Sequence, residues 1–125
     1  MQIRNRVFEL VARVEAGDFL GAFEEFYSDD VVMRENAGVP TRGKAANRER
    51  ERAFVGAIRT IHENRAAAVV VDGNRVAINW NAEYTFADGR RLRFDQIAFQ
   101  HWENDRVVCE QFYYDSATLA SEQAA

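Results

Sequence analysis

Apolar residues recur at helical spacing at the start of the chain. One stripe of five predicts a helix over residues 2–16 with one face toward a core: Ile3, Val7, Leu10, Val11 and Val14. Gly17 is a suitable residue to end that helix, and Asp18 is a suitable cap for a second helix over residues 18–27.

The middle of the chain is predicted to hold a short strand, a loop and a third helix. Residues 31–33 form a short run rich in β-branched side chains, which favours a strand. Residues 36–43 contain the only proline and two glycines and are predicted to be a loop. The third helix is predicted over residues 44–61, with Phe54, Ile58 and Ile61 toward the core.

From Ala66 onward the pattern changes to the period of two that strands show. Turn residues divide this half into four predicted strands, at about 66–71, 76–86, 90–102 and 107–115. Consecutive strands joined by tight turns form an antiparallel meander, so three helices followed by this meander indicate an α+β fold. We expect one domain over residues 1–125, with a flexible tail at 116–125.

Alternation on the second of these strands separates two faces. One face is apolar, with Val76, Ile78, Trp80, Ala82 and Tyr84. The other face is mostly polar, with Ala77, Asn79, Asn81, Glu83 and Thr85. Taken alone, this pattern places the apolar set against the helices and the polar set in water.

Composition narrows the function classes. The chain has 47% hydrophobic residues, enough to build a core. Its net charge of −4 disfavours a nucleic-acid partner. No stretch approaches the roughly 20 apolar residues of a membrane span, so no membrane association is expected. The one cysteine, Cys109, fits a reducing cytoplasmic location. The charged run at 48–52 alternates in sign and is interpreted as a solvated helix face.

The order of these segments resembles the nuclear transport factor 2-like superfamily, on its SnoaL-like and ketosteroid isomerase-like side. The resemblance rests on residues 26–33 and on the last two predicted strands, and it extends from Val7 to Asp115. It implies a cone-shaped, curled antiparallel sheet with three N-terminal helices that enclose a cavity. It also implies a homodimer that forms through the sheets, and no cofactor.

The resemblance assigns the strand faces differently from the alternation. It implies cavity positions on three strands, from which we select a substrate-binding set: Asn79, Asn81, Glu83, Gln96, Ala98, Gln100, Phe112 and Tyr114. Tyr27, at the end of the second predicted helix, completes this set. A second copy of the chain would then cover the opposite apolar face, which includes Trp80 and Phe99. The two assignments stay open, as does a shifted register in which several of these amides face water.

Glu35 and Glu110 are the candidate catalytic residues. Glu35 occupies the position where ketosteroid isomerases carry their general base, and the alternative is a surface glutamate paired with Arg34 or Arg42. Glu110 and Glu83, if both lie inside, are expected to share a proton. The two histidines lack the spacing of a metal site, so no metal is expected.

Departures from the enzymatic relatives limit the reaction. Leu10 and Ala98 stand where the isomerases carry their oxyanion donors, and Phe112 stands where the cyclases carry an aspartate. Without those donors a standard steroid isomerase is not expected. We therefore expect a protein that binds a small organic ligand in its cavity and performs acid–base isomerase, cyclase or hydratase chemistry. The alternative is a non-catalytic ligand-binding or protein-interaction module.

Overall fold

The structure is a computed structural model that describes residues 2–117. Residues 118–125 of the predicted tail lie outside the described residues. Within residues 2–117 the helices are α1 (Gln2–Glu15), α2 (Phe19–Phe26) and α3 (Lys44–Ala57). The strands are β1 (Tyr27–Glu35), β2 (Thr41–Arg42), β3 (Ile58–Asp72), β4 (Arg75–Phe86), β5 (Arg91–Glu103) and β6 (Arg106–Tyr113).

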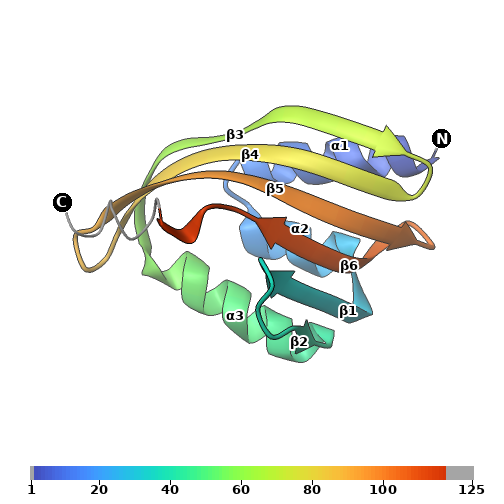
Figure 1. Cartoon of the computed structure of the whole chain (residues 1–125), viewed down its shortest axis with the longest axis horizontal. Coiled ribbons are helices and arrows are strands. Elements are labelled where there is room, and N and C mark those ends of the chain that lie inside the picture. The colour runs from blue at the N-terminus through green and yellow to red at the C-terminus, as the bar shows by residue number, and fades with distance from the viewer. Residues whose placement is uncertain (1, 118–125) are drawn as a thin grey trace.

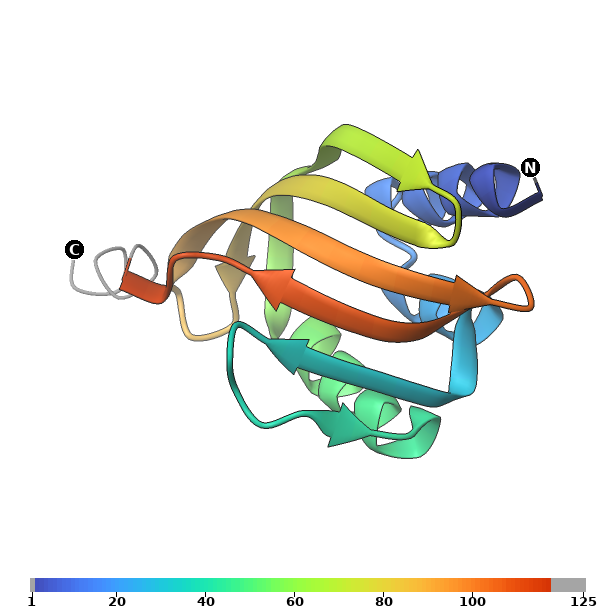
Figure 2. The ribbon, with the colours of Figure 1, turned by 45° about the vertical axis from the view of Figure 1, so that its right-hand side comes forward.

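The strands form one curled, unclosed sheet with the order β2-β1-β6-β5-β4-β3. Neighbouring strands are antiparallel except for β1 and β6, which run parallel. The helices lie on the concave side of the sheet, with α1 along β3 and α3 along β1 (Figures 1 and 2). The predicted α+β class and the curled sheet are confirmed.

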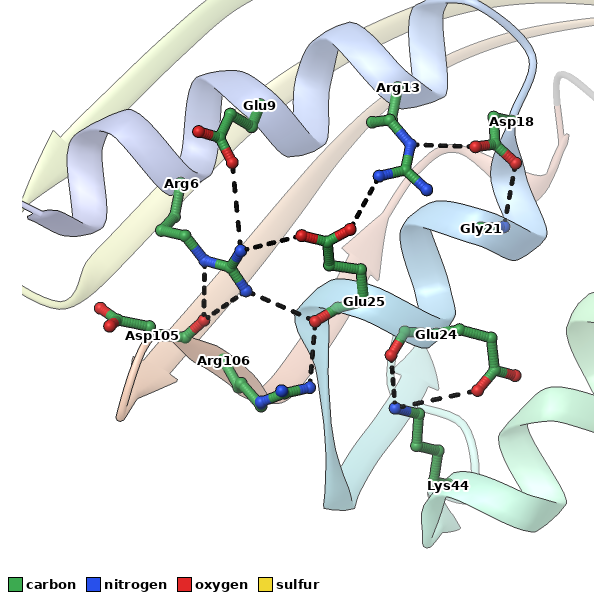
Figure 3. A network of polar contacts seen from close by, with 10 residues as sticks. All are labelled: Arg6, Glu9, Arg13, Asp18, Gly21, Glu24, Glu25, Lys44, Asp105 and Arg106. Carbon is green, nitrogen blue, oxygen red and sulfur yellow. Dashed lines mark hydrogen bonds and ion pairs between the residues drawn. The ribbon is translucent and has the colours of Figure 1, made fainter.

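The junction between α1 and α2 follows the local sequence. Gly17 adopts a φ of +88°, which side chains disfavour, and the Asp18 carboxylate accepts a hydrogen bond from the Gly21 amide at 3.0 Å. Arg13 bridges Asp18 and Glu25, each at 2.9 Å (Figure 3). The predicted helix stop and cap are therefore both confirmed.

Cationic side chains hold the C-terminal end of α2. Lys44 donates to the carbonyl oxygen of Glu24 at 2.8 Å, and Arg106 donates to that of Glu25 at 3.0 Å (Figure 3). Positive charge at the end of a helix stabilises its exposed carbonyl groups. Lys44 also donates to the carbonyl oxygen of Tyr27 at 2.8 Å. This anchoring fixes the backbone where Tyr27 begins β1.

The boundary between α3 and β3 differs from the prediction. The helix ends at Ala57, and β3 begins at Ile58 instead of near Ala66, so Ile58 and Ile61 belong to the strand. Ladder pairing with β4 stabilises this longer strand, from Ile58 opposite Phe86 to Asp72 opposite Arg75. Three register shifts interrupt the ladder between β3 and β4. Each shift breaks the period-two alternation of the sequence, so the first half of β3 could not be recognised from that pattern.

The strand faces are settled by the register between β4 and β5. Trp80 lies opposite Gln96, and Ile78 lies opposite Ala98, so each pair shares one face of the sheet. That face is the concave one, because Ile78 is fully buried and Trp80 is 8% exposed. The alternation of β4 therefore predicted its faces correctly, and the placement of Asn79, Asn81 and Glu83 on the concave side is wrong.

Candidate functional site

A cavity of about 410 Å³ lies between the concave face of the sheet and the helices. This volume falls in the range of small-molecule sites, roughly 300–1,000 Å³. Ten of its lining residues are aromatic: Phe19, Phe23, Tyr27, Phe54, Trp80, Tyr84, Phe86, Phe94, Phe112 and Tyr114. Polar groups gather at a few points on this wall, and residues far apart in the sequence come together in each group.

A buried carboxylate, Glu110, is the centre of the first polar group. The Tyr27 hydroxyl donates to Oε1 of Glu110 at 2.5 Å, and the Gln100 amide donates to Oε2 at 2.7 Å. Trp102 in turn donates its indole N–H to Oε1 of Gln100 at 2.8 Å. The sheet sets this geometry, because Gln100 lies directly opposite Glu110 across β5 and β6. Glu110 and Gln100 are 2% and 1% exposed.

The Trp102 indole fixes the direction of the hydrogen bonds from Trp102 through Gln100 to Oε2 of Glu110. An indole N–H only donates, so it must meet the Gln100 oxygen, and the Gln100 nitrogen must then face Glu110. Oε2 of Glu110 is therefore an acceptor. At Oε1 two states remain: the ionised carboxylate accepts from Tyr27, or the protonated carboxyl donates to the phenol oxygen. In the second state the Tyr27 O–H is free to point into the cavity.

Burial brings the pKa of the Glu110 carboxyl group close to neutral pH. Loss of solvation raises the pKa of Glu110 to about 7, against the opposing effect of the hydrogen bonds from Tyr27 and Gln100. Burial and the neighbouring Glu110 raise the pKa of Tyr27 well above its ordinary value. Tyr27 is thus a phenol beside a carboxyl group that gains and loses its proton at physiological pH.

Glu35 is the centre of a second polar group, at the end of β1. Arg50 donates to Oε2 of Glu35 at 2.8 Å, and Tyr114 donates its hydroxyl to Oε1 at 2.6 Å. Asn36 accepts from the Tyr114 backbone amide at 3.0 Å and so keeps the tyrosine beside Glu35. Burial and Glu35 raise the pKa of Tyr114 to about 12. Glu35 lines the cavity as predicted, but its cationic partner is Arg50 and not Arg34 or Arg42.

Glu51 is a cavity residue that the sequence analysis missed. It lies on α3 three residues before Phe54, and both side chains line the cavity with Arg50. Burial raises the pKa of Glu51, with a lowering effect from Arg50 and a raising effect from Glu35. The alternating charges at 48–52 concealed this position. Its spacing from Phe54 was the available signal, because residues three apart share a helix face.

The predicted substrate-binding and catalytic residues divide into three groups. Seven line the cavity: Tyr27, Glu35, Gln96, Gln100, Glu110, Phe112 and Tyr114. Ala98 is fully buried in the hydrophobic core on the same face. Three lie on the outer face: Asn79 donates to Asp95 at 2.9 Å, Glu83 pairs with Arg93 at 2.8 Å, and Asn81 lies between them along β4. The proposed sharing of a proton between Glu83 and Glu110 is therefore wrong.

Gln96 differs from the other polar residues of the cavity wall. Its side-chain amide forms no hydrogen bond within residues 2–117, and it faces the cavity beside Trp80. Among these residues no group of three His, Cys, Asp or Glu side chains could hold a metal ion. Their helices are also too short or too polar to cross a membrane.

A family model for the SnoaL-like domain matches residues 1–114. The chain belongs to the SnoaL-like family. No curated protein matches this SnoaL-like chain in sequence.

Solved structures share its fold. A proposed SnoaL-like polyketide cyclase from Mesorhizobium loti has a TM-score of 0.81 and 24% identity, over 91% of this chain and all of that one. A second proposed SnoaL-like polyketide cyclase, from Jannaschia sp. CCS1, has a TM-score of 0.83 and 10% identity, over 99% and 92% of the two chains. An LEH-like epoxide hydrolase from M. tuberculosis has a TM-score of 0.78 and 15% identity, over 97% and 88%.

Proposed function

We propose that this SnoaL-like protein binds a small, largely apolar organic molecule in its cavity and catalyses proton transfer on it. The observation that carries the proposal is the chain from Trp102 through Gln100 and Glu110 to Tyr27. It ends on the cavity wall with a phenol, and a carboxyl group that changes protonation near neutral pH lies behind that phenol. A general acid works best with a pKa near the working pH.

The chemistry follows from the two states of Glu110. When Glu110 is protonated, Tyr27 gives its proton to a ligand oxygen and takes the Glu110 proton in the same step. Glu110 is then a carboxylate, and it recovers its proton when the ligand oxygen returns one through Tyr27. Gln100 and Trp102 are positioning residues, because Gln100 holds Glu110 and Trp102 holds Gln100.

Glu35 supplies the complementary base in this proposal. It stands on the same cavity wall, and Arg50 and Tyr114 orient its carboxylate. A carboxylate removes a proton from the ligand while Tyr27 stabilises the oxygen on which negative charge develops. Gln96 has a free amide and orients the ligand. Similarity to proteins described as polyketide cyclases and an epoxide hydrolase supports a small organic substrate.

Hydrogen–deuterium exchange tests this function without a known product. The protein is incubated in D₂O with a panel of cyclic ketones and enones, and exchange at the carbon next to the carbonyl is followed by NMR. We expect Tyr27→Phe and Glu35→Gln each to slow exchange by roughly 100-fold or more. Tyr113→Phe is the matched control, because Tyr113 lies on the outer face of the sheet, opposite Ile97, and does not line the cavity. Equal exchange rates for wild type and Tyr27→Phe would contradict the role of Tyr27.

Non-catalytic binding is the alternative, and one observation favours it. Within the described residues every fully enclosed side-chain nitrogen and oxygen has a hydrogen-bond partner, and the Glu51 carboxylate and Gln96 amide, which have none, face the cavity. The cavity is therefore stable without a reacting ligand. Binding of cyclic ketones without any exchange would support this alternative.

We also propose that a second copy of the chain covers the outer face of the sheet. Val70, Ile97, Phe99 and Tyr113 are exposed apolar residues there, at 59%, 39%, 43% and 46%. The ladders place them side by side, because Ile97 lies opposite Tyr113 and Phe99 opposite Ala77, which is itself opposite Val70. A contiguous exposed apolar patch typically marks an interface.

A further inference from the structure

The charged side chains of the cavity wall are matched with partners, except for one. Glu35 pairs with Arg50 at 2.8 Å, and Arg90 pairs with Asp88 at 2.8 Å. Glu110 accepts hydrogen bonds from Tyr27 and Gln100. Glu51 lines the same cavity, yet its carboxylate forms no hydrogen bond or ion pair within residues 2–117.

Glu51 lines the cavity together with the Glu110 group and a cluster of aromatic rings. Burial and the negative charge of Glu51 raise the pKa of Tyr84, and Glu51 also raises the pKa values of Glu110 and Tyr27 behind stronger effects of burial. Such effects require that the Glu51 carboxylate lies within electrostatic range of all three groups. Glu51 shares a face of α3 with Phe54, three residues on, and lines the same cavity as Tyr27, Tyr84 and Glu110.

Aromatic rings surround Tyr84 on the same cavity wall. Their centroids lie 5.7–6.2 Å from that of Tyr84, and the rings belong to Phe19, Phe54, Phe86 and Phe94. The face of an aromatic ring attracts a cation, and the attraction grows when water is excluded. A carboxylate without a partner beside several aromatic rings is an arrangement that recognises a positively charged group.

We propose that the ligand of this cavity carries a protonated amine, which pairs with Glu51 and lies against the aromatic rings around Tyr84. This inference rests on the proposed ligand-binding function and names the chemical class of the ligand. A neutral apolar ligand would displace water from Glu51 and leave a desolvated charge without a partner, which is unfavourable. An ammonium group replaces that water with a charge-assisted hydrogen bond.

A pair of ligands of equal size tests this proposal. 2-Phenylethylamine is protonated at pH 7.5, and 2-phenylethanol has the same ring and chain but no charge. Each is titrated into the protein, and the indole N–H signal of Trp80, which lines the cavity, reports binding by NMR. We expect the amine to bind wild type at least tenfold more tightly than the alcohol.

Two variants identify the residue responsible. Glu51→Gln keeps the shape and removes the charge, so it should abolish the preference for the amine and leave alcohol affinity within twofold. Glu49→Gln makes the same change in charge on the outer side of α3, where Glu49 pairs with Arg52, and should keep the preference. Retention of the preference by Glu51→Gln would overturn the proposal.

The result in wild type separates this inference from the proposed function. If both ligands move the Trp80 signal with equal affinity, the amine assignment is wrong and the ligand-binding cavity stands. If neither ligand moves that signal, the amine proposal fails for this class, and the deuterium-exchange assay decides on the cavity itself. Because this comparison uses unaltered protein, a variant that failed to fold would not affect it.

Discussion

Gln100 donates its amide N–H to the buried carboxylate of Glu110 at 2.7 Å, directly across the β5–β6 ladder. This contact joins the framework of the sheet to the proposed chemistry. The Trp102 indole fixes which end of the amide faces Glu110, and the amide in turn fixes which oxygen of Glu110 is left for Tyr27. The acid–base group is therefore oriented by two neighbouring strands and one indole.

Replacement of Gln100 by leucine should destabilise the fold and raise the pKa of Glu110. The indole N–H and the carboxylate oxygen each lose a buried partner, and an unsatisfied group costs about 1–3 kcal/mol. Urea denaturation should show a larger loss at pH 8, where Glu110 is charged, than at pH 6. Gln96→Leu is the control, because the Gln96 amide has no hydrogen bond within the described residues. Equal losses for both variants at both pH values would be inconsistent with this account.

The stability of the protein should depend on pH through Glu110. Its pKa is about 7 in the folded protein and 4.5 as the ordinary value, so between these values the folded state holds a proton that the unfolded state has released. The contribution of the protonated Glu110 to the free energy of unfolding is therefore complete below pH 4.5 and is lost as pH rises through about 7. The whole effect is about 3 kcal/mol, at 1.36 kcal/mol per pKa unit.

Glu110→Gln isolates this contribution. Denaturation of wild type and variant from pH 4.5 to 8 should show the wild type losing stability relative to Glu110→Gln as pH rises. Other titrating groups, including Glu51, are common to both proteins and cancel in the difference. A constant difference across this range would show that Glu110 has an ordinary pKa.

Two neighbours on β4 test which face of the strand is inside. Trp80 is 8% exposed on the concave face. Replacing a buried tryptophan by alanine lowers the free energy of unfolding by about 3–5 kcal/mol. Asn81 points outward, where substitutions usually change stability by less than about 0.5 kcal/mol. Denaturation of Trp80→Ala and Asn81→Ala should show this contrast. A reversed order would restore the opposite assignment of the strand faces.

The proposed dimer predicts that Phe99→Glu is monomeric. The charge would lie at the centre of the outer apolar patch, where desolvation in an interface is unfavourable. Light scattering measures the mass, and Val39→Glu is the control because Val39 is 90% exposed in the loop before β2. A wild-type monomer, or a dimer retained by Phe99→Glu, would remove the interface.

Local chemistry explains which parts of the fold were predictable. The cap at Asp18 and the stop at Gly17 depend on a few adjacent residues, and both were predicted. The β5–β6 turn was also predicted, and Asn104 and Asp105 both adopt the positive φ values that a two-residue hairpin requires. The start of β3 was missed because Ile58 and Ile61 continue the helical spacing of Phe54, and only pairing with β4 makes them a strand.

The candidate site was predictable where one strand carried the signal and not where two elements had to meet. Glu35 and Glu110 were identified from their own segments, and both line the cavity. Glu51 was missed because its neighbours alternate in charge, and its burial depends on the sheet that folds across α3. The faces of β4 followed from its own alternation, and the assignment of Asn79, Asn81 and Glu83 to the cavity from the family resemblance was wrong.

The most direct test of the central claim is a titration of Glu110 itself. Carbon-13 NMR of the glutamate carboxyl groups, with Glu110→Gln to assign the signal, measures its pKa in the folded protein. We predict a midpoint near pH 7, in agreement with the raised pKa of the buried carboxyl, and a simultaneous shift of the Tyr27 ring signals. A midpoint near 4.5, with Tyr27 unaffected, would contradict the proposed acid–base pair.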